Sequence, residues 1–147
     1  MKYIAYGSNL SLEQMAVRCP DAQIAGKGFL YGWKLKFRYH ATIECSEGSR
    51  VPVLVWEISR KDEKSLDRYE GYPHYYRKRK LKVAMTDLDG ENAREEIAMV
   101  YIMTEKGEGG MPARSYYKLL AEGYKRFGFD PEILERALEE ALEESGE

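Results

Sequence analysis

The sequence has little of what would place it in several large protein classes. It contains only two cysteines and two histidines in 147 residues, so neither a disulfide framework nor a zinc site is expected. No apolar run approaches the roughly 20 residues that cross a bilayer, and the first ten residues lack the apolar stretch of a secretory signal. The net charge of -2 argues against nucleic-acid binding, which usually requires a large positive excess.

These absences favour a protein of the reducing cytoplasm, with neither a membrane nor a nucleic acid as partner. The length fits one domain, residues 1–147, and hydrophobic residues at 44% with charged residues at 33% are an ordinary globular balance. The sequence contains neither a G-x-S-x-G nucleophile elbow nor a P-loop. Cys19 or Cys45 as a nucleophile is the less common alternative to a buried small apolar side chain. The oligomeric state stays open.

Apolar alternation, helix caps and turn residues predict the order of the elements. Strands are expected at 2–6, 29–31, 33–39, 51–58, 76–85 and 96–103, and helices at 12–18, 60–69, 114–127 and from Pro131 onward. The polar stretch 44–50 and the glycine-rich stretch 106–112 are expected to be loops, and Asp89-Gly90 a hairpin turn. Because strands and helices do not alternate regularly, we predict an α+β fold with a largely antiparallel, barrel-like sheet.

Among what is present, twelve tyrosines suit a polar pocket or a partner surface, and one of them opens a distinctive segment. Tyr6-Gly7-Ser8-Asn9-Leu10 lies between the first strand and a helix that Ser11 is expected to cap. Glycine lets the backbone approach a ligand, and free N–H groups at a helix start attract anions such as carboxylates. The simpler interpretation, a strand-to-helix turn with no ligand, remains open from the residues alone.

A second segment, Leu66–Pro73, ends a helix with an acid. Glu70 is expected at the last turn, where the helix dipole disfavours a carboxylate and increases its affinity for a proton. Tyr69, Tyr72 and Tyr75 are expected to exclude water from it. These are properties of a general base near neutral pH, although a solvated surface glutamate is the commoner case.

Together these segments resemble the γ-glutamylcyclotransferase-like family, which includes the AIG2-like and BtrG-like proteins. Ala5–Leu10, A-Y-G-S-N-L, is similar to the opening motif of the family. Leu66–Arg77 contains L-D-x-x-E-G and an aromatic-arginine pair like those at its centre, while Pro112, Tyr116 and Gly123 match a looser third pattern. The resemblance covers nearly the whole chain in the right order.

The resemblance implies a small, mostly antiparallel β-barrel with flanking helices, and an enzyme that cleaves a γ-glutamyl amide into 5-oxoproline and an amine. It implies Glu70 as the catalytic base. Substrate binding falls to the loop and to one further tyrosine: Tyr6, Gly7, Ser8, Asn9, Leu10 and Tyr116. No cofactor and no metal are implied, because the nucleophile belongs to the substrate itself.

The sequence departs from the family pattern in lacking a glycine-rich stretch before the central strand, where Ala41-Thr42-Ile43 stands instead. One wall of the pocket is therefore expected to differ, and the amine half of the substrate stays open. So does the choice between Tyr75 and Tyr76, and between Tyr116 and Tyr117, as the pocket tyrosines. The alternative function is a non-catalytic module that binds a small molecule in the same pocket.

Overall fold

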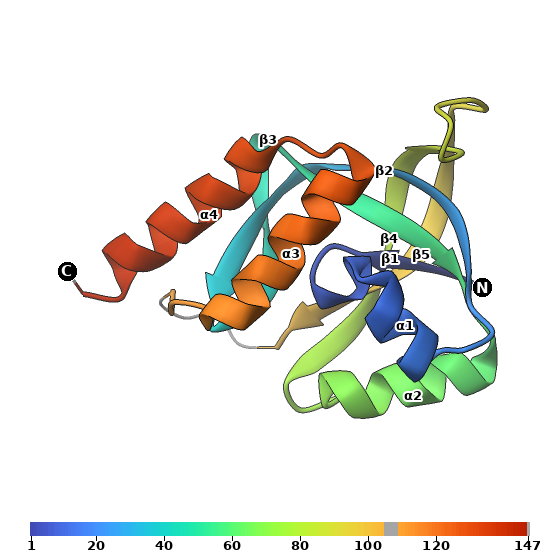
Figure 1. The fold of residues 1–147 in the computed structure, drawn as a ribbon, viewed down its shortest axis with the longest axis horizontal. Helices are drawn as coiled ribbons and strands as arrows, with labels where there is room; N and C mark the ends of the chain where they lie inside the picture. Colours follow the sequence, from blue (N-terminus) through green and yellow to red (C-terminus); the bar gives the residue numbers. More distant parts are fainter. Residues whose placement is uncertain (105–108, 147) are drawn as a thin grey trace.

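The computed structural model describes residues 1–104 and 109–146 and is built around a closed barrel of five strands (Figure 1). Four α-helices and one short 3-10 helix complete this part of the chain. The elements in chain order are β1 (Lys2–Ala5), η1 (Ser8–Leu10), α1 (Leu12–Arg18), β2 (Gln23–Arg38), β3 (His40–Glu57), α2 (Arg60–Glu70), β4 (Tyr76–Thr86), β5 (Arg94–Met103), α3 (Arg114–Phe127) and α4 (Pro131–Glu144).

The strands follow one another around the barrel in the order β1-β3-β2-β4-β5, and β1 closes it against β5. That closing pair is parallel, with Tyr3 opposite Met99, whereas the other neighbouring strands are antiparallel. The predicted α+β fold with a mostly antiparallel barrel and flanking helices is therefore confirmed. The strands contribute much of the apolar core, including Leu30, Val53, Leu54, Val83 and Val100, which are fully or almost fully buried.

Strands β2 and β3 are much longer than the sequence predicted. The separate strands at 29–31 and 33–39 are parts of one strand, and the loop predicted at 44–50 was wrong because β3 runs through it. The pairing passes from Tyr31 opposite Arg50 to Trp33 opposite Cys45, so residues 46–49 lie opposite Gly32 alone and form a bulge. Residues 44–50 of β3 are polar and mostly exposed, so they lack the apolar alternation by which a strand is predicted from sequence.

Two glycines let the β2 and β4 backbones approach closely. A Cβ atom at Gly26 would overlap the carbonyl oxygen of Thr86, and one at Gly28 would overlap that of Ala84. Both overlaps are with backbone atoms of β4, which cannot turn aside as a flexible side chain would. The register places Gly28 opposite Met85 in this pair. Glycine at these positions therefore allows the barrel to close between β2 and β4.

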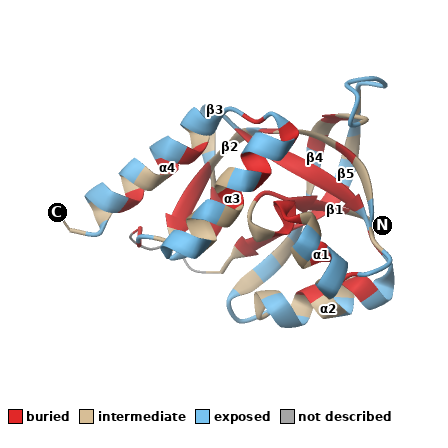
Figure 2. Cartoon of the chain, viewed as in Figure 1, coloured by how far each residue is buried: buried red, intermediate tan, exposed pale blue. Residues whose placement is uncertain are grey.

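The helices lie on two sides of the barrel: α3 and α4 across β2 and β3, and α1 beside α2 near β1 (Figure 1). Helix α4 begins at Pro131 as predicted and buries Leu134, Ala137 and Ala141, whereas Leu142 near its end is exposed; buried and exposed positions alternate along the helix (Figure 2). Of the loop predicted at 106–112, residues 106–108 lie outside the described part. The N–H of Gly110 donates to the carbonyl of Phe37 in β2, and the N–H of Tyr39, just after β2, donates to the carbonyl of Gly110.

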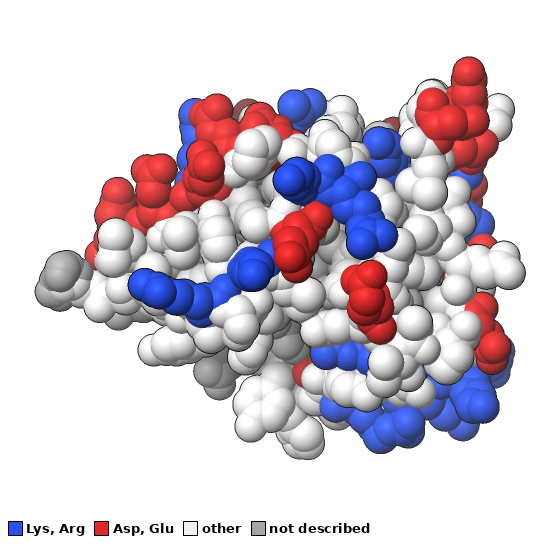
Figure 3. Space-filling view, in the orientation of Figure 1, with Lys and Arg blue, Asp and Glu red and all other residues white. Residues whose placement is uncertain are grey.

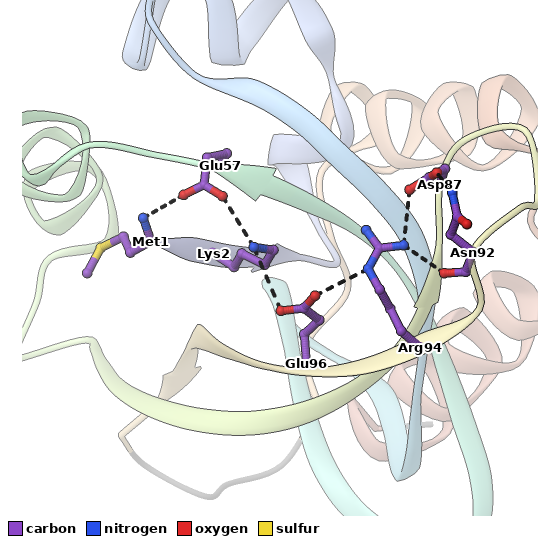
Figure 4. A network of polar contacts seen from close by, with 7 residues as sticks. All are labelled: Met1, Lys2, Glu57, Asp87, Asn92, Arg94 and Glu96. Carbon is purple, nitrogen blue, oxygen red and sulfur yellow. Dashed lines mark hydrogen bonds and ion pairs between the residues drawn. The ribbon is translucent and has the colours of Figure 1, made fainter.

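Charged side chains gather along α4 and around the outer end of the β4–β5 hairpin, with a basic cluster near α2 (Figure 3). A connected polar network joins β1, β3 and β5 (Figure 4). In it Lys2 lies between Glu57 and Glu96, at 3.4 and 3.7 Å, and Arg94 bridges Glu96 to Asp87. Partly exposed pairs of this kind stabilise a protein only modestly. In the described chain no helix is long and apolar enough to cross a membrane.

The glycine contact between β2 and β4 generates a test of the fold. Gly28→Ala should lower the free energy of unfolding by about 1–3 kcal/mol, because the added methyl group forces the two backbones apart. Lys80→Ala, at an exposed position of β4, serves as the control and should change stability by less than about 0.5 kcal/mol. Urea unfolding of both variants measures this, and equal stability would contradict the close-contact explanation.

Candidate functional site

The loop after β1 turns the chain from the barrel into two short helical segments. The chain passes Tyr6 and Gly7, forms η1, and enters α1 at Ser11, whose hydroxyl accepts a hydrogen bond from the Gln14 N–H at 3.1 Å. A Cβ at Gly7 would stand 3.3 Å from the Ala41 Cβ and 3.4 Å from the Tyr116 hydroxyl. The absence of a side chain at Gly7 therefore leaves open one side of a cavity that Gly7, Ala41 and Tyr116 line together.

The backbone of this loop has N–H groups that are available to a ligand. Among the described residues, the N–H groups of Gly7 and Ser8 donate to no acceptor, whereas those of Leu10 and Ser11 bond back to the carbonyls of Gly7 and Ser8. Free N–H groups beside a cavity are suited to an anion or to a polarised carbonyl oxygen. The loop thus offers the kind of donor that a carboxylate ligand needs.

The side chain of Asn9 is already engaged by the protein. Its amide nitrogen donates to the Tyr3 hydroxyl at 2.9 Å, and its amide oxygen accepts from Arg18 at 2.8 Å. The indole N–H of Trp56 donates to its carbonyl at 3.1 Å. Asn9 lines the cavity but is held by its neighbours. Leu10, by contrast, is buried against Gly123 of α3 and lies outside the cavity wall.

Glu70 is the last residue of α2, one residue beyond the predicted end. Ser59 and Asp62 form a reciprocal capping box at the start of this helix, and Gly71 ends it in the left-handed conformation with φ of 64°. The carboxyl group of Glu70 lines the cavity. Burial raises the pKa of Glu70 to about 7, opposed in part by the positive charge of Arg18. Loss of water is the main physical cause, ahead of any neighbouring charge.

Tyrosine is the commonest residue in the cavity wall. The residues that line it are Tyr3, Ile4, Tyr6, Gly7, Ser8, Asn9, Ala41, Glu70, Tyr76, Tyr101 and Tyr116. Burial raises the pKa of each of the five phenols, that of Tyr116 to about 12, so all are neutral at physiological pH. Among these described lining residues, Glu70 is the one whose pKa has been moved close to neutrality.

Two of the tyrosines are fixed by the backbone of the same residue, Ala41. The hydroxyl of Tyr76 donates to the carbonyl of Ala41 at 2.8 Å, and the N–H of Ala41 donates to the Tyr116 hydroxyl at 3.0 Å. The structure therefore brings Tyr76 and Tyr116, rather than Tyr75 and Tyr117, to the cavity. Tyr117 instead packs on Phe37 outside it, with ring centroids 5.9 Å apart.

The expectation that Tyr69, Tyr72 and Tyr75 exclude water from Glu70 was wrong. Their side chains are 54%, 40% and 75% exposed. Tyr69 faces solvent from the last turn of α2, and Tyr72 and Tyr75 come after the helix end. Two buried tyrosines of the cavity wall, Tyr3 and Tyr101, shield Glu70 from water instead. The sequence did not predict either of them. No local signal marks them, since each is simply an aromatic residue on a barrel strand, and only the parallel β1–β5 pair places them together.

A polar network fixes α2 on the barrel. The hydroxyl of Tyr101 donates to Asp67 at 2.6 Å, and Lys78 of β4 lies 2.9 Å from the same carboxylate and 2.8 Å from Glu63. Asp67 is one turn before Glu70 on the helix. These contacts fix the end of α2 relative to β4 and β5, the strands that supply Tyr76 and Tyr101 to the cavity wall.

The described residues, 1–104 and 109–146, contain no group of three His, Cys, Asp or Glu side chains arranged to hold a metal ion. His40 lies against the ring of Tyr116, with centroids 5.0 Å apart in an edge-to-face contact. Cys19 is buried and Cys45 is exposed, and neither lines the cavity.

The raised pKa of Glu70 has a consequence for stability. The Glu70 carboxyl binds its proton more tightly in the folded state than in the unfolded chain. The free energy of unfolding of the protein therefore falls as pH rises between the two pKa values, from about 4.5 to about 7. Glu70→Gln should therefore gain stability relative to the parent at pH 8 and lose that gain toward pH 4.5. Urea unfolding at both pH values tests this, with Glu122→Gln on the exposed side of α3 as control. A difference that does not change with pH would contradict it.

Comparison with known proteins identifies the family. Residues 3–123 match the family described as "Gamma-glutamyl cyclotransferase, AIG2-like". The mouse and human proteins named "Gamma-glutamylcyclotransferase" are each 31% identical to this chain, over 91% of it and 75% of their own length.

Solved structures agree with this match. A structure titled "Gamma-glutamyl cyclotransferase" superposes with a TM-score of 0.78 at 30% identity and covers 92% of this chain and 85% of that one. YkqA from Bacillus subtilis shares the fold, with a TM-score of 0.74 at 18% identity, over 97% of this chain and 54% of its own. The chain therefore belongs to the gamma-glutamyl cyclotransferase, AIG2-like family and is an enzyme of the cyclotransferase type.

Proposed function

We propose that this enzyme cleaves a γ-glutamyl amide by intramolecular cyclisation, releasing 5-oxoproline and a free amine, with Glu70 as the base. The observation that carries the proposal is a carboxyl group with a pKa of about 7 that shares a cavity with the donor loop at Gly7 and Ser8. A general base is most effective when its pKa lies near the working pH. The family names of the relatives agree with this chemistry.

In the proposed reaction, Glu70 accepts a proton from the α-ammonium group of the substrate. The freed amine attacks the γ-carbonyl carbon, a five-membered ring closes, and the bond from that carbon to the leaving nitrogen breaks. The two protons that the ammonium loses end on the leaving amine, so the reaction consumes no proton. One carboxyl that alternates between its two states is sufficient, and the nucleophile is already close to its target.

The loop supplies the complementary half of the site. We assign the N–H groups of Gly7 and Ser8 to the α-carboxylate and to the carbonyl oxygen that becomes negative during attack. Tyr6 and Tyr116 line the same cavity as neutral phenols. Asn9 contributes by holding the loop in place, and Leu10 by anchoring it in the core.

A non-catalytic binding module is the competing function. Such a module would bind a carboxylate with the same loop, but it would have no use for a carboxyl whose pKa is raised toward neutrality. The presence of Glu70 in the cavity wall therefore favours the enzyme over the module.

Replacing Glu70 by glutamine tests the base directly. Turnover should fall by about 10² or more, because glutamine keeps the shape but accepts no proton. The assay measures 5-oxoproline release from a panel of γ-glutamyl compounds in the presence of a chelator, since no metal is proposed. Substrate affinity should stay close to that of the parent, because the carboxylate contacts are in another segment. Glu122→Gln is the control, and near-normal release by Glu70→Gln would end the case for this base.

The pH dependence of the parent enzyme gives an independent test. Because the base must be ionised, kcat/KM should fall about tenfold per pH unit below a midpoint near the Glu70 pKa of about 7. That midpoint belongs to the free enzyme, so substrates with different leaving amines should share it. A midpoint near 4.5, the ordinary value for glutamate, would mean that the titrating group is not a water-excluded Glu70.

A further inference from the structure

Arg18 links the two halves of the site from behind the cavity wall. It is the last residue of α1, and its guanidinium donates to the Asn9 amide oxygen at 2.8 Å and to the Ser8 hydroxyl at 3.3 Å. The same guanidinium lies 4.4 Å from the ring centroid of Tyr69, the residue before Glu70. One side chain thus contacts both the donor loop and the end of α2.

The contacts of Arg18 are made to the wall and not to the cavity. Arg18 is not among the residues that line the cavity, whereas Ser8 and Asn9 are. Asn9 extends this hydrogen-bonded chain, because its amide nitrogen donates to the hydroxyl of Tyr3 in β1. A planar guanidinium suits this position, because it donates in two directions in one plane and presents its face to an aromatic ring.

The charge of Arg18 also reaches the carboxyl group. The titratable or charged groups around Glu70 come from every element at the cavity: Arg18 of α1, Tyr3 of β1, Tyr6 after it, Tyr76 of β4, Tyr101 of β5 and Tyr116 of α3. All but Arg18 are neutral phenols. The positive charge favours the ionised carboxylate and so opposes the effect of burial on the pKa of Glu70.

We propose that Arg18 is a positioning residue that clamps the Ser8-Asn9 loop to the end of α2 and holds its positive charge next to the helix end that carries Glu70. The proposal rests on the function assigned above to Glu70 and the loop. Arg18 acts through Ser8, Asn9 and Glu70 and touches no substrate. Its two effects are separable. A lysine retains the positive charge but loses the planar guanidinium, whose Nη1 donates to both Ser8 and Asn9 and whose face lies over the Tyr69 ring.

The experiment compares Arg18→Met and Arg18→Lys with the parent. Arg68→Met is the matched control, since Arg68 lies in the last turn of α2 but is exposed to solvent. The pKa of Glu70 is measured by NMR on its isotope-labelled carboxyl carbon, with Glu70→Gln identifying the signal. Hydrogen exchange of the Gly7 and Ser8 amides reports on the loop, and thermal unfolding shows that each variant is folded.

Arg18→Met should raise the pKa of Glu70 above that of the parent, speed amide exchange in the loop, and reduce kcat/KM at pH 7 by about 10- to 100-fold, as expected for a misplacement of about 1 Å. Arg18→Lys should leave the pKa close to that of the parent while still loosening the loop. Arg68→Met should change none of the three quantities. A purely structural role would lower the unfolding temperature without moving the pKa.

An unchanged Glu70 pKa in folded Arg18→Met would overturn the proposal. So would a co-crystal with a γ-glutamyl compound in which the substrate carboxylate touches the guanidinium, because Arg18 would then be a binding residue. The pKa and the exchange rates are measured without substrate, so failure there concerns Arg18 alone. If every γ-glutamyl compound is left intact by the parent, the proposed function fails, while the NMR result still decides the role of Arg18 as a clamp.

Discussion

Keeping one carboxyl group away from water is the constraint on which the arrangement of this site depends. An isolated carboxylate in an apolar interior is far too costly to persist, so a protein that buries one must moderate its surroundings. Here the surroundings are phenols, which are bulky enough to exclude water and polar enough to be hydrogen-bonded themselves. Tyr6 donates to the Tyr101 carbonyl and Tyr101 to Asp67, so the wall leaves few polar atoms without partners. One arginine behind the wall supplies charge without entering the cavity.

The closed barrel is what allows this wall to form from distant parts of the chain. Because β1 pairs with β3 on one side and with β5 on the other, Tyr3 and Tyr101 meet although nearly a hundred residues separate them. Helix α2 then reaches the barrel end with its own anchor on β4, through Lys78. The catalytic geometry proposed for this enzyme is therefore a property of tertiary pairing rather than of any single motif.

The sequence was most informative where local chemistry decides the structure. Helix α1 was predicted with its bounds and its Ser11 cap, and α2 with its start and to within one residue of its end, because helix caps act within a few residues. The α+β barrel followed from the element order. The polar bulge of β3 was missed because its strand character comes from pairing with β2 and not from its own residues. Likewise, the residues that exclude water from Glu70 were misassigned to sequence neighbours, whereas the barrel recruits them from other strands.

The hydrogen bonds to the Ala41 backbone have a consequence for how substitutions can change this cavity. Tyr76 and Tyr116 are held by the carbonyl and the N–H of that residue, and every amino acid except proline offers both groups. These two hydrogen bonds therefore place no demand on the side chain at position 41, which is a buried methyl group beside Gly7. A substitution at position 41 would therefore change the size of the cavity beside Gly7 without removing the backbone groups that hold the two tyrosines.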